Sequence, residues 1–312
     1  MKLKVLSLFD GMSVAQQALT ELGYELDYYA SEIDPYAIAV TQSNFPNTIQ
    51  LGDVSKIDSS FYNRTDYGLP EFDLLIGGSP CQDLSIAKKD RKGLDGERSS
   101  LFWEYVRILN EVKPKYFVLE NVASMPKKDK DIITQTLGVE PIMINASLVS
   151  AQNRKRLFWT NIPKVTQPED KDIWYQDIIH GFDKDYELSE KTKQIIERNF
   201  TKSGQELFLL KEDTTRIEKI SYPSRIKQHF GLAKIPTLTS SMGSGGNNVA
   251  VITQQGKLRK LTPTECLRLQ SMPDNYFDKA IYKGKPISNS QRYKMCGNAF
   301  NCAVVKHILK NI

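Results

Sequence analysis

Short apolar segments alternate with amphipathic segments along the first half of the chain, and this alternation constrains the fold most strongly. Residues 2–9 (KLKVLSLF) and 25–32 (ELDYYASE) are typical of strands, and residues 14–23 between them have helical spacing. Parallel strands need a crossover between them, which is usually a helix. The order therefore predicts an α/β fold, with a mostly parallel sheet covered by helices on both faces. Further strands are predicted at 48–54, 72–78 and 116–122, a helix at 99–113, and a hairpin from 141–149 and 156–162.

The chain changes character after residue 163. Residues 164–235 are polar, rich in lysine and glutamate and only weakly periodic, and residues 239–248 (TSSMGSGGNN) are rich in glycine and serine. Helical spacing of apolar residues returns in 262–272 and in the tail from 297. We therefore expect a catalytic and cofactor-binding domain at 1–163, a smaller domain at 164–285, and a C-terminal helix within 286–312 that returns to the first domain.

The composition narrows the class of protein. With 40% hydrophobic and 25% charged residues, the 312-residue chain has the balance of a soluble globular protein. No apolar run approaches a membrane span, and no secretory signal begins the chain, so we expect a cytoplasmic protein without membrane contact. The four cysteines form no CxxC pair and the three histidines lack ligand spacing, so we expect no metal site. The net charge of +5 is compatible with a polyanionic partner.

Residues 7–13 (SLFDGMS) join the first predicted strand to the first helix, where nucleotide-binding α/β folds keep a glycine turn. Only Gly11 is present, so the GxGxxG pattern of a nicotinamide-dependent dehydrogenase is missing. Glu32 ends the second strand about 20 residues after Gly11, a spacing at which an acid can bind a ribose diol. Asp53 ends the third strand. Each acid alone is more often a turn residue, but together they indicate an adenosine-type ligand.

A cysteine follows a proline in the segment LLIGGSPCQDLS, residues 74–85. Residues 74–76 are typical of a short buried strand, and Pro80 restricts the backbone of the loop after it. Cys81 is therefore expected at the carboxyl end of a strand, where open α/β sheets place their ligands. A small buried hydrophobic residue is the more common fate of a free cysteine, so this segment alone leaves both interpretations open.

The motifs reached so far are similar to those of the cytosine-5 DNA methyltransferases, which use S-adenosylmethionine. The resemblance covers nearly the whole chain, in the family's order, through LFDGMS, SEID, GDV, GGSPCQDLS, LENV (119–122), QNRKRLF (152–158), RKLTPTECLRLQSMPD (259–274) and GNAF (297–300). Ser13 stands where the family usually has a second glycine, as in the animal de novo enzymes, and Ala299 and Phe300 replace a Ser-Val pair. The resemblance implies a Rossmann-like class I methyltransferase sheet with a smaller target-recognition domain.

The resemblance also implies the chemistry. A Cys81 thiolate adds to carbon 6 of cytosine and so activates carbon 5 for methylation, in covalent catalysis to which cysteine is suited. Glu120 protonates or hydrogen-bonds ring nitrogen N3. Arg154 and Arg156 face the same side of an extended segment, and Arg156 is assigned to the base carbonyl. Arg154 then supports the pocket or contacts a phosphate. The target cytosine has to leave the duplex for this reaction.

Ligand contacts follow from the same resemblance. Cofactor contacts are expected from Phe9, Asp10, Gly11, Met12, Ser13, Glu32, Ile33, Asp53, Val54, Pro80, Asn298 and Ala299. DNA contacts are expected from Gln82, Ser85, Gln152, Arg154, Thr237, Leu238, Ser241 and Gly243, and from a basic loop at 84–98. The expected partners are double-stranded DNA and a restriction endonuclease that acts on the same site, and we expect a monomer.

Two other functions remain open at this point. An RNA cytosine methyltransferase of the tRNA-modifying type would share the architecture, but those enzymes usually carry a Cys-Phe-Thr motif that this sequence lacks. A catalytically inactive, DNA-binding regulatory homologue is the second alternative. The presence of Cys81, Glu120 and both arginines argues against it.

Overall fold

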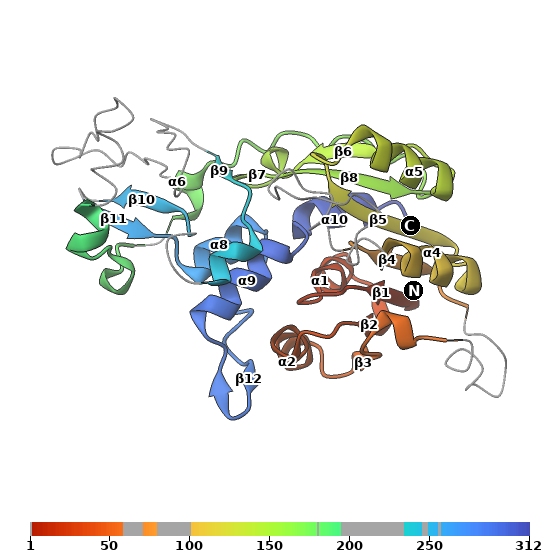
Figure 1. Cartoon of the computed structure of the whole chain (residues 1–312), viewed down its shortest axis with the longest axis horizontal. Helices are drawn as coiled ribbons and strands as arrows, with labels where there is room; N and C mark the ends of the chain where they lie inside the picture. Colours follow the sequence, from red (N-terminus) through yellow and green to blue (C-terminus); the bar gives the residue numbers. More distant parts are fainter. Residues whose placement is uncertain are drawn as a thin grey trace.

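The computed structural model describes residues 2–58, 71–79, 101–179, 181–194, 234–244, 249–254 and 257–312. Seven strands form one sheet in the order β3-β2-β1-β4-β5-β8-β6 (Figure 1). The parallel strands are β1 (Lys2–Leu8), β2 (Glu25–Ser31), β3 (Ile49–Gln50), β4 (Leu74–Gly77) and β5 (Tyr116–Val122). Strand β8 (Lys155–Thr160) pairs antiparallel with β5 on one side and with the edge strand β6 (Ile142–Asn145) on the other. The predicted mostly parallel sheet and its hairpin are confirmed.

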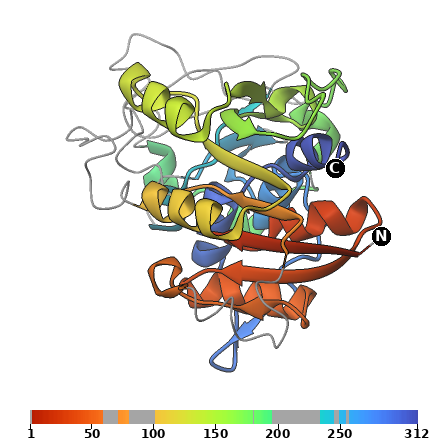
Figure 2. The ribbon, with the colours of Figure 1, turned by 90° about the vertical axis from the view of Figure 1, so that its right-hand side faces the viewer.

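Helices cover both faces of the sheet, as Figure 2 shows. One face carries α1 (Val14–Glu21), α2 (Pro35–Asn44) and α10 (Cys302–Leu309), and the other carries α4 (Leu101–Val112) and α5 (Lys127–Leu137). Successive residues of β1 alternate between two buried clusters, because side chains of a strand point to opposite faces. Val5 packs with the helices of the first face, and Leu6 packs with those of the second.

Smaller elements lie beside the carboxyl ends of the strands (Figure 1). They are β7 (Gln152–Asn153), α6 (Tyr175–Ile178), β9 (Ile235–Pro236), β10 (Val251–Gln254), β11 (Lys257–Lys260), α8 (Pro263–Leu269), β12 (Ile281–Tyr282), β13 (Lys285–Pro286) and α9 (Asn289–Asn298). Short 3-10 helices are η1 (Val54–Lys56), η3 (Ala146–Leu148), η4 (Lys184–Tyr186) and η5 (Ser240–Ser244). A fully buried ion pair between Arg259 and Glu265 joins β11 to α8, with 2.7 Å between Nη2 and Oε1. Among the described residues, no helix is long and apolar enough to cross a membrane.

The structure differs from the sequence-based expectation in three elements. The predicted strand 141–149 is the strand β6, residues 142–145, followed by η3. β3 covers only residues 49–50 of the predicted strand 48–54, because the Asp53 side chain accepts a hydrogen bond from the Ser55 N–H and begins η1. The predicted C-terminal helix is two helices, α9 and α10. The chain is extended at Ala299, and Asn301 caps α10 by accepting a bond from the Val304 N–H.

One buried cluster runs from the first face of the sheet through residues 235–309. The described part of the expected small domain therefore shares one hydrophobic core with the first face of the sheet. The division at 163 and 285 stays a prediction.

Candidate active site and cofactor pocket

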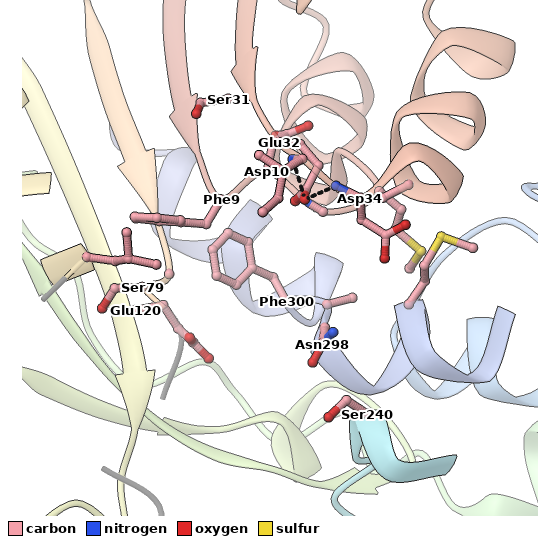
Figure 3. Close-up of a pocket in the computed structure, with 18 of the residues that line it drawn as sticks. Phe9, Asp10, Ser31, Glu32, Asp34, Ser79, Glu120, Ser240, Asn298 and Phe300 are labelled. Atoms are coloured by element: carbon pink, nitrogen blue, oxygen red, sulfur yellow. Dashed lines mark hydrogen bonds between the residues drawn. The ribbon is translucent and has the colours of Figure 1, made fainter. Parts of the chain in front are cut away.

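A pocket of about 570 Å³ opens at the carboxyl ends of β1, β2, β4 and β5. That volume lies within the range of small-molecule sites. Parallel strands end at one edge of the sheet, so residues far apart in sequence meet there. Figure 3 shows the labelled side chains around this pocket. Its walls include most of the predicted cofactor contacts and three of the four predicted catalytic residues. The cofactor contacts among them are Phe9, Asp10, Gly11, Met12, Glu32, Ile33, Asp53, Val54, Asn298 and Ala299, and the catalytic residues are Glu120, Arg154 and Arg156.

The turn after β1 has an unusual backbone. Phe9, Gly11 and Ser13 all have positive φ angles, of 57°, 61° and 56°. Only glycine adopts this region without steric cost, so the turn stores strain at Phe9 and Ser13. Hydrogen bonds hold it in place: the Asp10 N–H donates to the Ser31 carbonyl at 3.1 Å, and Tyr276 donates to the Met12 carbonyl at 2.6 Å.

Asp10 is the centre of a buried hydrogen-bond network below the turn. Its carboxylate accepts bonds from Tyr28 at 2.8 Å and from the Ser13 hydroxyl, and Thr41 donates to Ser13 at 3.0 Å. Burial raises the pKa of Asp10 to about 6. Ser13 is fully buried and does not line the pocket in this conformation, so its predicted cofactor contact stays a prediction. Its hydroxyl instead ties the turn to Asp10 and α2.

Glu32 organises the wall beside the turn. One carboxylate oxygen accepts the Gly11 N–H at 2.8 Å, and the other accepts the N–H groups of Ile33 and Asp34, also at 2.8 Å (Figure 3). Ile33 is 73% exposed although it is apolar, and it lines the pocket. An exposed apolar side chain beside a carboxylate suits a ligand with a flat ring and a diol.

Asp53 lies three residues after the end of β3, where it caps η1. The hydrogen bond that its carboxylate accepts from the Ser55 N–H holds the pKa of this carboxyl below the ordinary value. Sequence reasoning missed Asp34 and Lys294, which also line the pocket and form an ion pair of 2.6 Å between Oδ2 and Nζ. The N-cap position of Asp34 at α2 was readable from its sequence, since Pro35 follows it. Its partner Lys294 lies 260 positions away and gave no local signal.

The catalytic end of the pocket contains Glu120 on β5 and Arg156 on β8. These antiparallel strands pair Glu120 with Phe158 and Val122 with Arg156, so the carboxylate and the guanidinium are diagonal neighbours on one face. The Arg156 Nε lies 2.7 Å from Glu120 Oε1, and both side chains are mostly buried. The other carboxylate oxygen of Glu120, Oε2, lies beside Gly78. Gly78 precedes Ser79, which is the last described residue before the nucleophile loop.

The predicted residues Pro80, Cys81, Gln82 and Ser85, and the loop 84–98, lie outside the described residues. Their roles therefore remain predictions. The three described cysteines are buried. Burial raises the pKa of Cys302 to about 12 and the pKa values of Cys266 and Cys296 well above the ordinary range, so these thiols are inert.

Three predicted DNA contacts are not at the surface. Gln152 is fully buried, where its amide donates to the Leu269 carbonyl at 3.0 Å and accepts the Leu238 N–H at 3.0 Å. Leu238 is 2% exposed and Arg154 is 3% exposed. All three side chains are buried in this conformation, and their predicted DNA contacts stay predictions. Arg154 and Arg156 both line the pocket, but the extended pattern of QNRKRLF gave no indication of the chain that covers Arg154.

The remaining predicted DNA contacts lie on or beside η5. Thr237 donates to the Asn153 carbonyl at 2.7 Å, and the exposed Ser241 shares a hydrogen bond of 2.8 Å with Thr239. Gly243 packs on α9, since a Cβ there would lie 2.5 Å from Lys294 Cβ. Phe300 was missed as a pocket residue, although the sequence flagged it as a departure from the family. Figure 3 shows its ring pointing into the pocket, and a Cβ on Gly78 would lie 2.8 Å from it.

Groups of three or more potential metal-ligating side chains are absent among the described residues. The pocket instead offers carboxylates, backbone N–H groups and apolar walls. These donors suit an organic cofactor with hydroxyl groups and a planar ring.

Comparison with known proteins agrees with this arrangement. The family model described as C-5 cytosine-specific DNA methylase matches residues 3–312. The chain is 27% identical over 330 residues to type II methyltransferase M.Bsp6I of Bacillus sp. (strain RFL6), covering 99% of this chain and 98% of that one. It is 28% identical over 330 residues to type II methyltransferase M.HhaI of Haemophilus parahaemolyticus, covering 99% and 94%.

Two solved structures share the fold. The Entamoeba histolytica methyltransferase EhMeth aligns with a TM-score of 0.69 at 13% identity, over 100% of this chain and 98% of that one. The S. pombe Dnmt2 methyltransferase aligns with a TM-score of 0.64 at 16% identity, over 98% and 97%. The family match covers nearly the whole chain and includes every wall of the pocket. The protein therefore belongs to the C-5 cytosine-specific DNA methylase family and is a DNA (cytosine-5-)-methyltransferase.

Proposed function

We propose that the protein transfers a methyl group from S-adenosylmethionine to carbon 5 of a flipped-out cytosine in a specific double-stranded DNA sequence, through a covalent Cys81 adduct. One observation carries this proposal. A single pocket has the carboxylates Glu32 and Asp53 on one wall and the Glu120–Arg156 pair on another. A bound nucleoside and a flipped base would meet in such a pocket.

The residues on the first wall fit the proposed cofactor. Glu32 is the candidate for the ribose hydroxyls, Ile33 for the adenine ring, and Asp53 for the adenine amino group. The Phe9–Met12 turn and Asn298 would hold the amino-acid part. When bound, S-adenosylmethionine supplies an electrophilic methyl group on its sulfonium.

The residues on the second wall would act on the base. The Cys81 thiolate forms a bond to carbon 6, and the electron pair of the 5,6 double bond moves into the ring, which makes carbon 5 nucleophilic. Glu120 is the candidate to give a proton to N3, and Arg156 holds the Glu120 carboxyl while its guanidinium faces the base carbonyl. After methylation, loss of the carbon 5 proton to a base restores the double bond as the sulfur leaves. The inert state of the three described cysteines supports Cys81 as the nucleophile.

Transfer of tritiated methyl groups from labelled S-adenosylmethionine tests the substrate. We expect incorporation into duplex DNA and none into a transfer-RNA pool of equal nucleotide concentration. Preferential labelling of RNA would support the RNA methyltransferase alternative. Labelling of neither would support a regulatory homologue. Mapping the methylated positions in plasmid DNA would then give the recognised sequence.

We also propose that a restriction endonuclease cleaves the same site, since the relatives M.Bsp6I and M.HhaI are named type II methyltransferases. Plasmid DNA methylated by this protein should then resist an endonuclease of the mapped specificity. We propose a cytoplasmic monomer, which sedimentation of the purified protein would test at 35.5 kDa.

A further inference from the structure

Arg154 joins three segments that are far apart in sequence. Its guanidinium donates to the Leu238 carbonyl at 3.1 Å, to the Gly297 carbonyl at 3.4 Å and to the Ala299 carbonyl at 2.7 Å. Leu238 belongs to the segment 237–244, which we call the recognition segment because the resemblance assigns it to DNA. Gly297 and Ala299 belong to the end of α9, whose residues form one wall of the cofactor pocket.

The recognition segment and the end of α9 are in direct contact at this point. A Cβ on Gly297 would overlap the backbone of Thr239 and Ser240. Only a glycine therefore lets the recognition segment lie against the helix. Figure 3 shows Ser240 and Asn298 close together on this wall, and both line the pocket.

Gln152 provides a second connection between the recognition segment and α9. Gln152, two residues before Arg154, accepts the Leu238 N–H, and its amide nitrogen lies 3.2 Å from Gln270 Oε1. Gln270 in turn donates to the Cys296 carbonyl at 2.5 Å. Gln152 thus holds the N–H of Leu238 and Arg154 holds its C=O. Leu238 therefore has little freedom to move independently of α9.

The bond from Arg154 to the Ala299 carbonyl connects this cluster to the catalytic residues. Arg154 holds the Ala299 carbonyl, and the next residue, Phe300, places its ring against Gly78. Gly78 lies beside Glu120 and close to the start of the nucleophile loop. A shift of the recognition segment would therefore reach both the cofactor wall and the catalytic wall through one guanidinium.

We propose that Arg154 is a positioning residue that couples DNA binding at the recognition segment to cofactor binding at the end of α9. The inference rests on the proposed function, because it takes the recognition segment to contact DNA and α9 to contact S-adenosylmethionine. Arginine suits the role and lysine does not, because only the planar guanidinium presents five N–H donors in a fixed geometry.

The test compares two affinities of S-adenosylhomocysteine measured by calorimetry, one without DNA and one at saturating duplex that carries the mapped methylation site. Their ratio is the coupling between the ligands, and it is typically about 5 to 150 where such coupling exists. We expect a ratio in that range for the wild type and a ratio near one for Arg154→Lys. A merely structural role would lower the stability of the fold but leave the ratio unchanged.

Arg292→Lys is the matched control, since Arg292 lies on α9, the helix whose end Arg154 contacts, and donates to the Ile287 carbonyl. It should keep the wild-type ratio. The salt dependence of DNA affinity gives a second readout: its slope should be the same in Arg154→Lys and the wild type. A slope lower by about one unit would identify Arg154 as a phosphate contact and overturn the inference.

Hydrogen exchange of the wild type covers the case in which Arg154→Lys does not fold. S-adenosylhomocysteine alone should slow exchange of the Ile235 and Leu238 amides, and the duplex alone should slow exchange of amides at 297–300. Absence of both effects overturns the inference. A coupling ratio of one in a wild type that still binds each ligand would also overturn it while leaving the proposed function intact. Failure to bind either ligand would instead contradict the proposed function.

Discussion

Glu32→Gln tests the cofactor wall most sharply, because the structure defines what the change removes. The carboxylate accepts three backbone N–H groups, one on Oε2 and two on Oε1. A glutamine has one acceptor oxygen, and its best orientation keeps the Ile33 and Asp34 bonds and turns its amide group toward the Gly11 N–H. One buried or half-buried donor left without an acceptor costs about 1–3 kcal/mol. That cost corresponds to a loss of about 5- to 150-fold in affinity if the turn has to be ordered for binding.

Calorimetry with S-adenosylhomocysteine measures this loss. Glu25→Gln is the matched control, since Glu25 lies at the opposite, exposed end of β2 and should leave the affinity unchanged. DNA affinity measured at the same salt concentration should not change in either variant. A Glu32→Gln protein that binds S-adenosylhomocysteine within twofold of the wild type would refute the assignment of Glu32 to the cofactor wall.

Three further predictions concern stability and specificity. The raised pKa of Asp10, about 6, means that the folded state holds this proton more tightly than the unfolded state, so the stability it contributes at low pH is lost between about pH 4 and 6. As the pH rises from 4 to 7, the free energy of unfolding of the wild type, measured with urea, should fall by about 2–3 kcal/mol relative to that of Asp10→Asn. Parallel pH profiles of the two proteins would contradict this. Glu265→Gln leaves Arg259 buried without its anion, so the unfolding free energy should fall by about 3–5 kcal/mol, and a fall below about 1 kcal/mol would show that the pair matters little. Replacing residues 164–238 with the segment of a related enzyme should transfer the methylated site, and an active chimera that keeps the original site would place specificity elsewhere.

The sheet could be predicted from the sequence because its signals are local. Residues 72–78 and 116–122 are apolar runs of strand length, and β4 and β5 lie within them. Short-range competition explains the errors. Asp53 can bond the Ser55 N–H two residues later, which ends the extended chain, and Asn301 caps a new helix where the apolar pattern predicted one continuous helix.

The site could be predicted only in part, because its geometry depends on contacts across long sequence separations. Glu32 directly follows β2 and Glu120 lies near the carboxyl end of β5, so their meeting in one pocket follows from the parallel sheet. Nothing near Arg154 in sequence indicates that Leu238 would cover it, since the two residues are 84 positions apart. Ser13 stands where the family usually has a glycine, and the sequence alone did not show how a serine fits there. The hydrogen-bond network through Asp10 that holds Ser13 also includes Thr41, which is 28 positions away.

Covalent trapping tests the central claim most directly. DNA that carries 5-fluorocytosine at the mapped site should form a complex with the wild type in the presence of S-adenosylmethionine, because the fluorine cannot leave as the proton does and the bond from Cys81 to carbon 6 persists. We predict a shifted band on a denaturing gel, with the attached nucleotide on the Cys81 peptide by mass spectrometry. Cys81→Ser should give no shifted band, and its rate of methyl transfer should fall far more than tenfold. A tenfold fall corresponds to about 1.4 kcal/mol in the barrier. A Cys81→Ser protein with a tenth or more of wild-type turnover, or a wild type that methylates DNA but forms no adduct, would contradict the account.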